Sequence, residues 1–314
     1  MHAHLKIKIS SSILKFMLVS VVICAYTIKR YNDLVEAINS LINQTYSDIE
    51  IILVIDEDIN LYKEIKSEFD IKVILNDRRL GLPASRNVGI SNASGDIIAF
   101  FDDDAVADRK WISELVKMYE ERNAIAAGGK ILPLWVSKKP KYFPEEFYWL
   151  VGATHKGFPE EITEVRNTFT SNLSFRADVL AELGGFKSEL KAKSGIPMQS
   201  EETEICERMR QKFGKGVLYN PNAIVYHKVF PEKLKLSYLL KRNFWQGYSK
   251  AIMEKSVGRI NEEKSFLKYL LVNRSLYRLK KGLTGSLEDL EKLAMMWLFT
   301  FCVGVGYVYG KISQ

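Results

Sequence analysis

The sequence predicts an α/β fold with a mostly parallel sheet, helices on both faces of that sheet and a helical C-terminal tail. Short apolar runs alternate with amphipathic segments from residue 18 onward, which is typical of repeated strand–helix units. Acidic residues directly follow two of these runs, at residues 56–58 and 102–104. Because ligands bind at the carboxyl ends of parallel strands, these acids also indicate where a functional site lies.

The strands of the first half are expected where apolar runs are continuous, because strands buried on both faces lack polar alternation. They cover residues 18–25, 49–55, 71–75 and 97–101. Between and after them, apolar residues recur with helical spacing. The expected helices cover residues 34–42, 61–69 and 83–93, and a further helix runs through Trp111 and Met118. Right-handed crossovers between parallel strands would connect these elements.

The second half has a different character. A strand is expected over residues 125–134, with Gly128 and Gly129 as a bulge or a point of close approach. Residues 136–159 are rich in aromatic residues, proline and lysine and predict a loop-rich insert over a binding site. Packing between the two halves is the expected role of most of the aromatic residues here, and stacking on sugar rings or contact with a membrane surface is the alternative. These residues are Trp135, Tyr142, Phe143, Phe147, Tyr148 and Trp149. A helix over residues 202–213 and a strand over residues 223–226 follow.

The composition is that of a globular protein, since 47% of the 314 residues are hydrophobic. Residues 1–17 contain lysines that interrupt the apolar runs, so they predict a flexible leader and not a secretion signal. Met17 is an alternative start. The three cysteines, Cys24, Cys206 and Cys302, lie far apart without metal-type spacing and are expected to be reduced packing residues.

The basic residues are unevenly distributed in a chain of net charge +7, and they dominate from Lys228 to Lys281. This indicates an anionic neighbour. Residues 231–290 are expected to form a basic helical region, and residues 291–312 a hydrophobic, membrane-associated helix that spans the bilayer, lies in its interface or packs on the protein. The preceding basic residues would face anionic lipid on the cytoplasmic side. No nucleic-acid partner is expected, because aromatic and basic residues do not interleave in a single-strand-binding motif.

Three adjacent carboxylates in the turn Asp102-Asp103-Asp104 repel one another unless a cation or hydrogen-bond donors neutralise them. Oxygen ligands on a short turn suit a hard divalent ion, Mg²⁺ or Mn²⁺, with water and phosphate oxygens as its other ligands. A solvated acidic turn is the alternative. Cys24 and Ala25 stand where a nicotinamide dehydrogenase has its glycines, so that class is not expected, and a nucleotidyltransferase would more often show a Gly-rich phosphate loop there.

An ordered series of motifs resembles the family 2 inverting glycosyltransferases, which have the GT-A fold with its Rossmann-like sheet. The motifs lie at residues 21–26, 54–58, 84–90, 95–104, 172–176, 184–186, 201–204 and at His227. Motifs in the right order are more specific than any one of them. The resemblance covers residues 19–227 and implies a nucleotide-sugar-binding half, residues 18–123, and an acceptor-binding half, residues 124–230.

The resemblance also implies residue roles. The implied metal ligands are Asp104, Asp102 and His227, and the implied donor-binding residues are Ala25, Tyr26, Asp56, Arg86, Asp102 and Asp103. Asp102 would hydrogen-bond the ribose and Asp56 the base. Arg86 would contact the nucleotide or its diphosphate. Position on a helix surface is the alternative for Arg86, and a core or surface role is the alternative for His227.

Glu201 and Glu202 are the candidates for the catalytic base, which takes the proton of the incoming hydroxyl. The family usually has Glu-Asp at these positions, so the base is assigned to Glu202, which is one methylene longer, with Glu201 as a helper or as the alternative. Acids that only favour the helix dipole are the competing interpretation. A phosphate acceptor needs no base, so the pair favours a hydroxyl acceptor over that of the polyprenyl-phosphate monosaccharide synthases.

The sequence therefore predicts a metal-dependent inverting glycosyltransferase. It would move a sugar from a UDP-sugar to a hydroxyl of a glycan or lipid-linked glycan at the cytoplasmic face of the cell membrane, in polysaccharide biosynthesis or protein glycosylation. Residues 242–247 resemble the family's acceptor-site helix but lack the ordered Gln and Arg-Trp motif of processive synthases. The alternatives are a catalytically silent, membrane-associated scaffold that binds nucleotide or saccharide, and a polyprenyl-phosphate glycosyltransferase.

Overall fold

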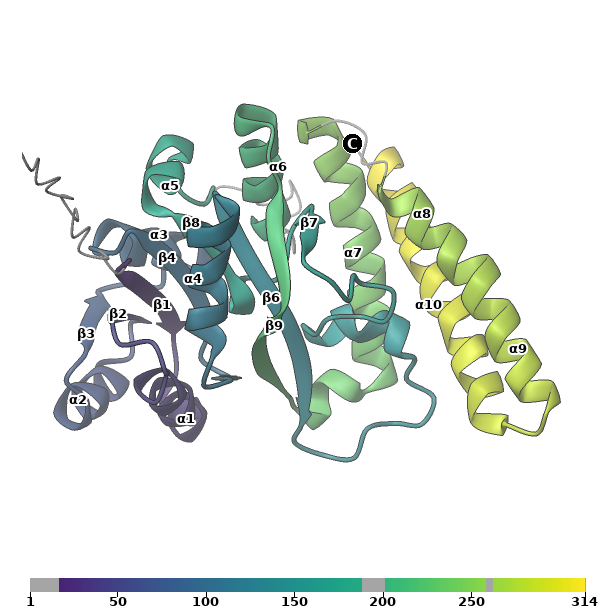
Figure 1. Cartoon of the computed structure of the whole chain (residues 1–314). Coiled ribbons are helices and arrows are strands. Elements are labelled where there is room, and N and C mark those ends of the chain that lie inside the picture. Colours follow the sequence, from purple (N-terminus) through teal and green to yellow (C-terminus); the bar gives the residue numbers. More distant parts are fainter. Residues whose placement is uncertain (1–16, 188–200, 258–261, 314) are drawn as a thin grey trace, which may run out of the picture.

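The computed structural model describes residues 17–187, 201–257 and 262–313, so the predicted leader lies outside the described residues except for Met17. The strands form one sheet in the order β3-β2-β1-β4-β8-β6-β9-β5, and β7 pairs with β9. Helices cover this sheet, and a group of long C-terminal helices stands at one end of it (Figure 1). The predicted α/β fold class is confirmed.

The bounds of the elements follow the predicted pattern closely in the first half. The strands are β1 (Val19–Ala25), β2 (Ile49–Asp56), β3 (Lys72–Asn76), β4 (Ile97–Asp102), β5 (Ala105–Ala107), β6 (Ala126–Trp135), β7 (Thr163–Val165), β8 (Leu173–Arg176) and β9 (Val217–Val229). The α-helices are α1 (Tyr31–Ile42), α2 (Ile59–Glu68), α3 (Leu82–Ser91), α4 (Trp111–Arg122), α5 (Ala177–Leu183), α6 (Glu201–Phe213), α7 (Leu236–Val257), α8 (Glu262–Lys268), α9 (Ser275–Leu283) and α10 (Leu287–Ile312). Shorter segments are the 3-10 helices η1 (Ile28–Arg30), η2 (Glu145–Val151), η3 (Thr170–Asn172) and η4 (Pro231–Leu234) and the π-helix η5 (Tyr269–Arg274), which joins α8 to α9.

The strands β3, β2, β1 and β4 are parallel, as predicted, and both faces of this half are covered. Helices α1, α2 and α4 pack with Val21 and Ile23 of β1 on one face, and α5 and α6 pack with Val22 on the other. Successive side chains of a strand point to opposite faces. A strand covered on both sides therefore needs apolar residues at every position, which explains the continuous apolar runs.

Beyond β4 the sheet becomes mixed. Strand β8 lies antiparallel between β4 and β6, whereas β6 and β9 are parallel. The short strands β5, β7 and β8 were not among the predicted strands, because three or four residues are too few to show a periodic pattern. The strand predicted over residues 223–226 is longer in the structure, since β9 begins at Val217, and Asn220-Pro221-Asn222 interrupts its apolar pattern.

The predicted close approach at Gly128 and Gly129 is confirmed. The pairing of β6 with β9 shifts register between Gly129 and Lys130. A Cβ atom on Gly129 would lie 1.9 Å from the carbonyl oxygen of Ala223, so only glycine fits there.

The loop-rich insert packs against the C-terminal helices. Phe143 and Phe147 are buried in a core with Met296 and Phe299 of α10, and the other predicted aromatic residues pack against it. Most of these aromatic residues therefore have a packing role, as predicted, but their partners lie in the second half itself and in the C-terminal helices, whereas packing between the two halves was expected. The three cysteines are free, as expected, and Cys206 is buried.

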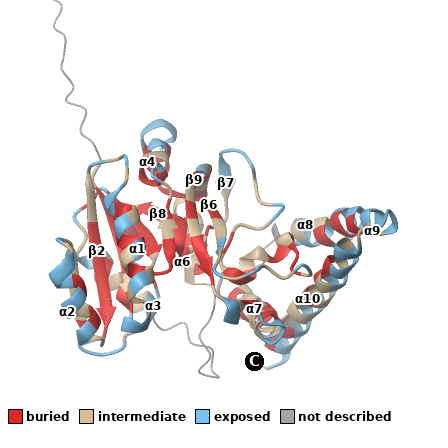
Figure 2. Cartoon of the chain, turned by 90° about the horizontal axis from the view of Figure 1, so that it is seen from below, coloured by how far each residue is buried: buried red, intermediate tan, exposed pale blue. Residues whose placement is uncertain are grey.

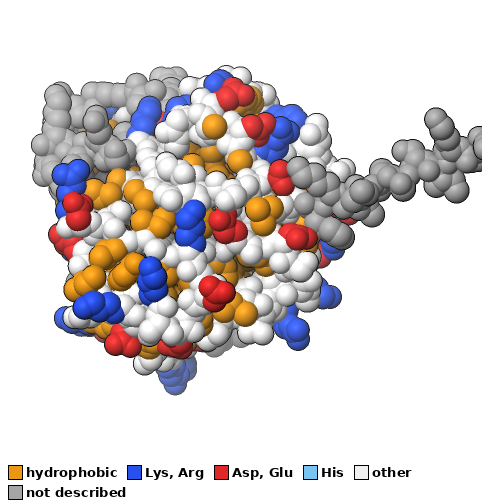
Figure 3. Space-filling view, turned by 90° about the vertical axis from the view of Figure 1, so that its left-hand side faces the viewer, with side chains coloured by type: hydrophobic (Ala, Val, Ile, Leu, Met, Phe, Trp, Pro, Cys, Tyr) orange, Lys and Arg blue, Asp and Glu red, His pale blue; other side chains and the backbone are white. Residues whose placement is uncertain are grey.

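Helix α10 begins at Leu287, earlier than the predicted hydrophobic segment, because the side chain of Ser286 caps it by accepting a hydrogen bond from the Asp289 amide. Among the described residues, α10 alone is long and apolar enough to cross a membrane by length and composition. It packs along α7 and α9, and the outer sides of α9 and α10 are largely exposed (Figure 2). The face at the opposite end of the molecule carries interspersed basic, acidic and apolar side chains (Figure 3).

Candidate active site

A cleft of about 630 Å³ opens at the carboxyl ends of β1, β2 and β4. The structure brings all the predicted site residues into its lining, although they come from both halves of the chain. These residues are Ala25, Tyr26, Asp56, Arg86, Asp102, Asp103, Asp104, Glu201, Glu202 and His227. Loops at the ends of parallel strands are free to carry polar side chains while the strands hold their positions, which explains why the site lies at this edge.

Asp102, Asp104 and His227 form a compact group of possible metal ligands. One ligand atom from each lies within 4.8 Å of the others. His227 Nε2 is 3.1 Å from Asp104 Oδ1 and 3.9 Å from Asp102 Oδ2. The pairing of Ala105 in β5 with His227 in β9 brings the histidine back to the acidic turn. Two carboxylates and an imidazole are suitable ligands for Mn²⁺ or another divalent ion of that kind.

Two cations also contact Asp104. Arg30 Nη1 lies 2.9 Å and Lys233 Nζ 3.3 Å from its Oδ2 atom. Burial alone would raise the pKa of Asp104, but the hydrogen bond with His227 and the surrounding positive charges lower it. Burial and the neighbouring charge of Asp104 raise the pKa of Asp103 to about 7. Within the acidic turn, Asp104 is therefore the carboxylate held most firmly in its ionised form.

Arg86 connects the acidic turn to the start of α6. Its side chain is buried, and Nη2 donates a hydrogen bond of 2.7 Å to Thr170 Oγ1. Nη1 lies 3.3 Å from Glu201 Oε1, and Nη2 lies 3.7 Å from Asp102 Oδ1. The guanidinium also lies over the ring of Phe186. These contacts rule out the helix-surface alternative for Arg86.

Glu201 and Glu202 begin α6 and differ in their surroundings. Glu201 pairs with Arg86, whereas burial and the nearby charge of Glu201 raise the pKa of Glu202 to about 7. A carboxyl group with this pKa can accept and release a proton near neutral pH. Both side chains line the cleft that also contains the acidic turn.

Asp56 is held at the end of β2 by three donors. Its Oδ1 accepts hydrogen bonds from Asn76 Nδ2 and Ser85 Oγ, both 2.7 Å, and Oδ2 accepts one from the Gly81 amide. Gly81 has a φ of +83°, a conformation that favours glycine. Buried Ala25 and half-exposed Tyr26 follow β1, and the guanidinium of Arg79 lies over the Tyr26 ring.

Sequence reasoning did not place several cleft residues. Lys233, Tyr238 and Thr170 line the cleft, and Arg30 contacts the cleft residue Asp104. None of the four gave a recognisable signal, because each lies in a short 3-10 helix or at the start of a helix without a motif. Arg242 begins the 242–247 stretch noted in the sequence and lines the cleft from α7. The sequence does not show that α7, which follows β9, lies beside the cleft residues of the first half, whereas the structure does.

Comparison with known proteins gives a family match. The model of "Glycosyl transferase family 2" matches residues 20–184. A relative from Haloferax volcanii, described as a glucosyl-dolichyl phosphate glucuronosyltransferase, is 39% identical over 95% of this chain and 97% of its own length. The succinoglycan biosynthesis protein ExoM of Rhizobium meliloti is 28% identical over 55% of this chain and 54% of its own length.

Solved structures resemble the chain in fold. A mannosyltransferase from Pyrobaculum calidifontis, in complex with GDP-Man and Mn²⁺, has a TM-score of 0.56 at 16% identity and covers 94% of this chain and 87% of its own. TarS 1–349 of S. aureus, in complex with UDP, has a TM-score of 0.53 at 16% identity and covers 95% of this chain and 91% of its own. At these identities the likeness concerns the fold.

Proposed function

The chain belongs to glycosyl transferase family 2 and is a glycosyltransferase, and we propose that it is a metal-dependent, inverting enzyme that uses a UDP-sugar donor. The observation that carries the proposal is the presence, in one cleft, of both a possible metal site and a carboxyl group with a raised pKa. An inverting transfer needs both a stabilised leaving group and a base on the opposite side of the sugar.

Asp104, Asp102 and His227 would hold the divalent ion, Mn²⁺ or Mg²⁺. The Nε2 atom of His227 points toward the acidic turn, 3.1 Å from Asp104 Oδ1, so it lies where a ligand shared with these carboxylates is needed. When bound, the ion would stabilise the negative charge that develops on the nucleoside diphosphate. The solved structure of the Pyrobaculum calidifontis mannosyltransferase is described with Mn²⁺, which supports this choice.

The donor would lie along the carboxyl ends of β1, β2 and β4. Asp56 would accept a hydrogen bond from the base, with Ala25 and Tyr26 beside it, and Asp102 one from the ribose. Arg86, with Asp103 nearby, would contact the nucleotide or its diphosphate. The fixed position of Asp56 and the burial of Arg86 support these assignments, because a site that is already organised loses less entropy on binding.

Glu202 would act as the base. Its carboxylate takes the proton of the acceptor hydroxyl while the hydroxyl oxygen bonds to the anomeric carbon. The bond from that carbon to the diphosphate breaks, and the diphosphate leaves with the electron pair. Glu201 is less suited because its contact with Arg86 engages it, and it would position Arg86 instead.

The acceptor would be a hydroxyl of a lipid-linked glycan at the cytoplasmic face of the membrane. The glucosyl-dolichyl phosphate named in the description of the Haloferax volcanii relative supports a lipid-linked acceptor, and that relative matches the chain over nearly its whole length. The apolar helix α10 supports membrane association. A polyprenyl phosphate acceptor is less consistent with the structure, because an ionised phosphate would leave Glu202 without a role.

A catalytically silent scaffold remains the second candidate. It is favoured by Glu202 standing where the family usually has aspartate, since the longer side chain moves the carboxylate. Transfer assays decide between the two.

The test is a binding and hydrolysis screen against UDP-, GDP- and dTDP-sugars with Mn²⁺, with Mg²⁺ and with a chelator. We expect metal-dependent use of a UDP-sugar. Asp104→Ala should lose both transfer and nucleotide binding, whereas Glu202→Gln should lose transfer only. Normal transfer by Glu202→Gln would remove the base assignment. Binding of a donor without hydrolysis or transfer would favour the scaffold, and lack of binding of any donor would refute the proposed donor site.

A further inference from the structure

Exposed apolar side chains recur along the outer face of α10 from Leu287 to Ile312. Residues spaced three or four apart lie on one side of a helix, and the exposed charged residues beside this face, Glu288, Glu291 and Lys311, are confined to the two ends of the helix. Phe301 is 68% and Ile312 79% exposed. The exposed stripe on α10 consists of Leu287, Leu290, Trp297, Phe301, Val305, Val308 and Ile312. A shallow apolar groove of about 530 Å³ runs beside Gly304 on the same helix.

The helices that run antiparallel to α10 carry a second exposed stripe. It consists of Leu267, Leu271, Leu276, Leu279 and Leu283 of α8, η5 and α9. Four exposed lysines lie on α8 and α9, and none of them forms an ion pair within the part of the chain that the structure describes. They are Lys264, Lys268, Lys280 and Lys281. Apolar stripes combined with unpaired lysines are complementary to an anionic lipid surface.

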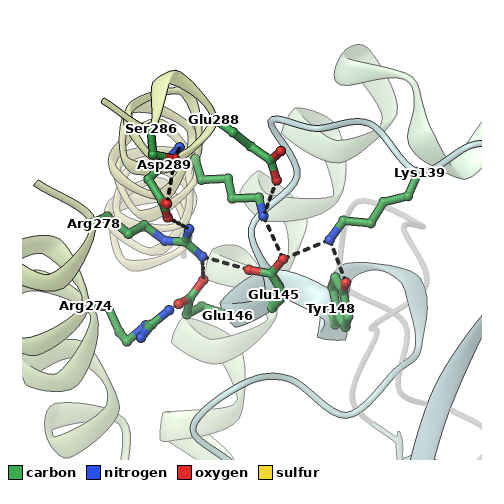
Figure 4. Close-up of polar contacts among 10 residues, drawn as sticks. Lys139, Glu145, Glu146, Tyr148, Arg274, Arg278, Ser286, Glu288 and Asp289 are labelled. Carbon is green, nitrogen blue, oxygen red and sulfur yellow. Dashed lines mark hydrogen bonds and ion pairs between the residues drawn. The ribbon is translucent and has the colours of Figure 1, made fainter. Parts of the chain in front are cut away.

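The inner face of α10 is fixed to charged parts of the protein. At its N-terminal end, Lys292 Nζ lies 2.8 Å from Glu145 Oε1. Asp289 Oδ1 lies 2.9 Å from Arg278, which also pairs with Glu146 (Figure 4). To cross a bilayer, α10 would either carry these buried charges with it or leave them without partners, and either change is strongly unfavourable.

The C-terminal half of α10 is held by backbone contact with α7. A Cβ atom on Gly306 would lie 1.9 Å from the carbonyl oxygen of Phe244, and one on Gly247 would lie 1.9 Å from that of Val303. Helix α7 also carries Lys241 and Arg242, so it cannot follow α10 into the acyl chains without a large penalty.

We propose that the hairpin of α8, α9 and α10 docks in the plane of an anionic lipid surface without spanning it. The apolar stripes lie among the acyl chains, and the lysines lie at the headgroups. The inference rests on the proposed membrane association and not on the proposed chemistry. Because α7 packs on α10 and also supplies Tyr238 and Arg242 to the cleft, docking brings the cleft close to the surface that presents a lipid-linked acceptor.

The test is flotation of the full-length protein with phosphatidylcholine vesicles, with and without phosphatidylglycerol. Phe301→Glu should lower partitioning about tenfold or more. Ile42→Glu, a control at a half-exposed apolar position on α1, should leave it unchanged. Lys280→Gln and Lys281→Gln should each lower partitioning roughly fivefold on vesicles with phosphatidylglycerol only. An alkaline carbonate wash should release the bound protein.

Several outcomes would overturn the proposal. Resistance to carbonate would show a spanning helix, and equal binding by Phe301→Glu would show another docking surface. A dimer that Phe301→Glu converts to a monomer, without vesicle binding, would make the stripe a contact between copies of the chain. Failure of the unaltered protein to bind vesicles would also refute the proposed membrane association. Transfer to a soluble acceptor would test the chemistry separately.

Discussion

The two glutamates at the start of α6 show how neighbouring residues acquire different chemistry. Glu201 lies 3.3 Å from the buried guanidinium of Arg86. Glu202 loses hydration on burial and lies beside the charge of Glu201, so its pKa rises to about 7. A carboxyl group whose pKa lies near neutral pH is a common basis of acid–base catalysis.

The rate of transfer should depend on the ionisation of Glu202. Because a base must be ionised to accept a proton, kcat should rise with pH through about 7 and level off above it. Glu202→Gln should lower kcat roughly 10²- to 10⁴-fold and remove this limb of the pH profile. A profile of kcat against pH checks the prediction, and an unchanged limb in Glu202→Gln would assign it to another group.

Stability gives a second readout of the same pKa. A pKa raised from 4.5 to about 7 means that the folded protein binds this proton more tightly than the unfolded chain does. The free energy of unfolding should therefore fall as pH rises from about 4.5 to 7, and this loss persists at higher pH. Glutamine does not ionise, so Glu202→Gln should not lose stability in this way. The variant should melt at a higher temperature than the wild type at pH 8, and the two proteins should melt at similar temperatures at pH 4.

Arg86 should be sensitive to a conservative change. Its guanidinium contacts Thr170, Glu201 and Asp102 at once, and a lysine ammonium cannot make all three contacts. Arg86→Lys should lower kcat/KM roughly 10- to 100-fold, the effect of losing one charged hydrogen bond. Arg176→Lys, at an exposed pair with Asp178, is the matched control and should be close to wild type. Similar losses in both variants would refute a specific role.

At the scale of elements, the crossing of α7 and α10 depends on glycine. Gly247 and Gly306 bring the two backbones into contact, whereas Gly304, on the outer side of α10, has nothing within 4 Å of a Cβ position. Small residues permit this close approach of helices.

Two alanine substitutions in α10 should have opposite effects. Gly306→Ala forces α7 and α10 apart and should lower the free energy of unfolding by about 1–3 kcal/mol. Gly304→Ala removes backbone freedom without a clash and should raise it by up to about 1 kcal/mol. Denaturant unfolding of both variants measures the difference. If both variants were as stable as the wild type, α10 would be able to move away from α7 without a loss of stability.

At the scale of the whole molecule, a cluster of buried charges attaches the C-terminal helices to the rest of the protein. Glu146 is fully buried and pairs with Arg274 and Arg278, and Glu145 contacts Lys139 and Lys292 (Figure 4). Since η2 lines the cleft through Leu150 and Val151, this cluster also fixes one wall of the site.

Removal of Glu146 should loosen the C-terminal helices. Glu146→Ala leaves two buried arginines without this partner and should cost about 3–5 kcal/mol. Lys139→Ala, at a partly exposed ion pair, should cost about 1 kcal/mol or less. Hydrogen exchange should accelerate in α9 and α10 of Glu146→Ala while β1, β2 and β4 stay protected. Uniform acceleration across the sheet would mean that the protein unfolds as one unit.

The sequence by itself determined the parallel half of the sheet, the family and the set of candidate site residues. Strands buried on both faces must be apolar throughout, and the acids that follow β2 and β4 can only lie at one edge. These signals come from residues that are adjacent or close in the sequence, so they can be recognised in a single sequence without a structure. The helix of Glu201 and Glu202 was found in the same way.

Only the tertiary structure decided which residues meet. His227 reaches Asp104 because β5 and β9 pair, and Arg86 reaches Glu201 across 115 positions of sequence. The short strands β5, β7 and β8 take their place from the strands beside them. The sequence of α10 is almost wholly apolar, so it does not predict which face of the helix is buried and which is exposed. That depends on the helices that pack against it. Contacts between distant segments set the pKa values and the charge partners, and no local pattern encodes them.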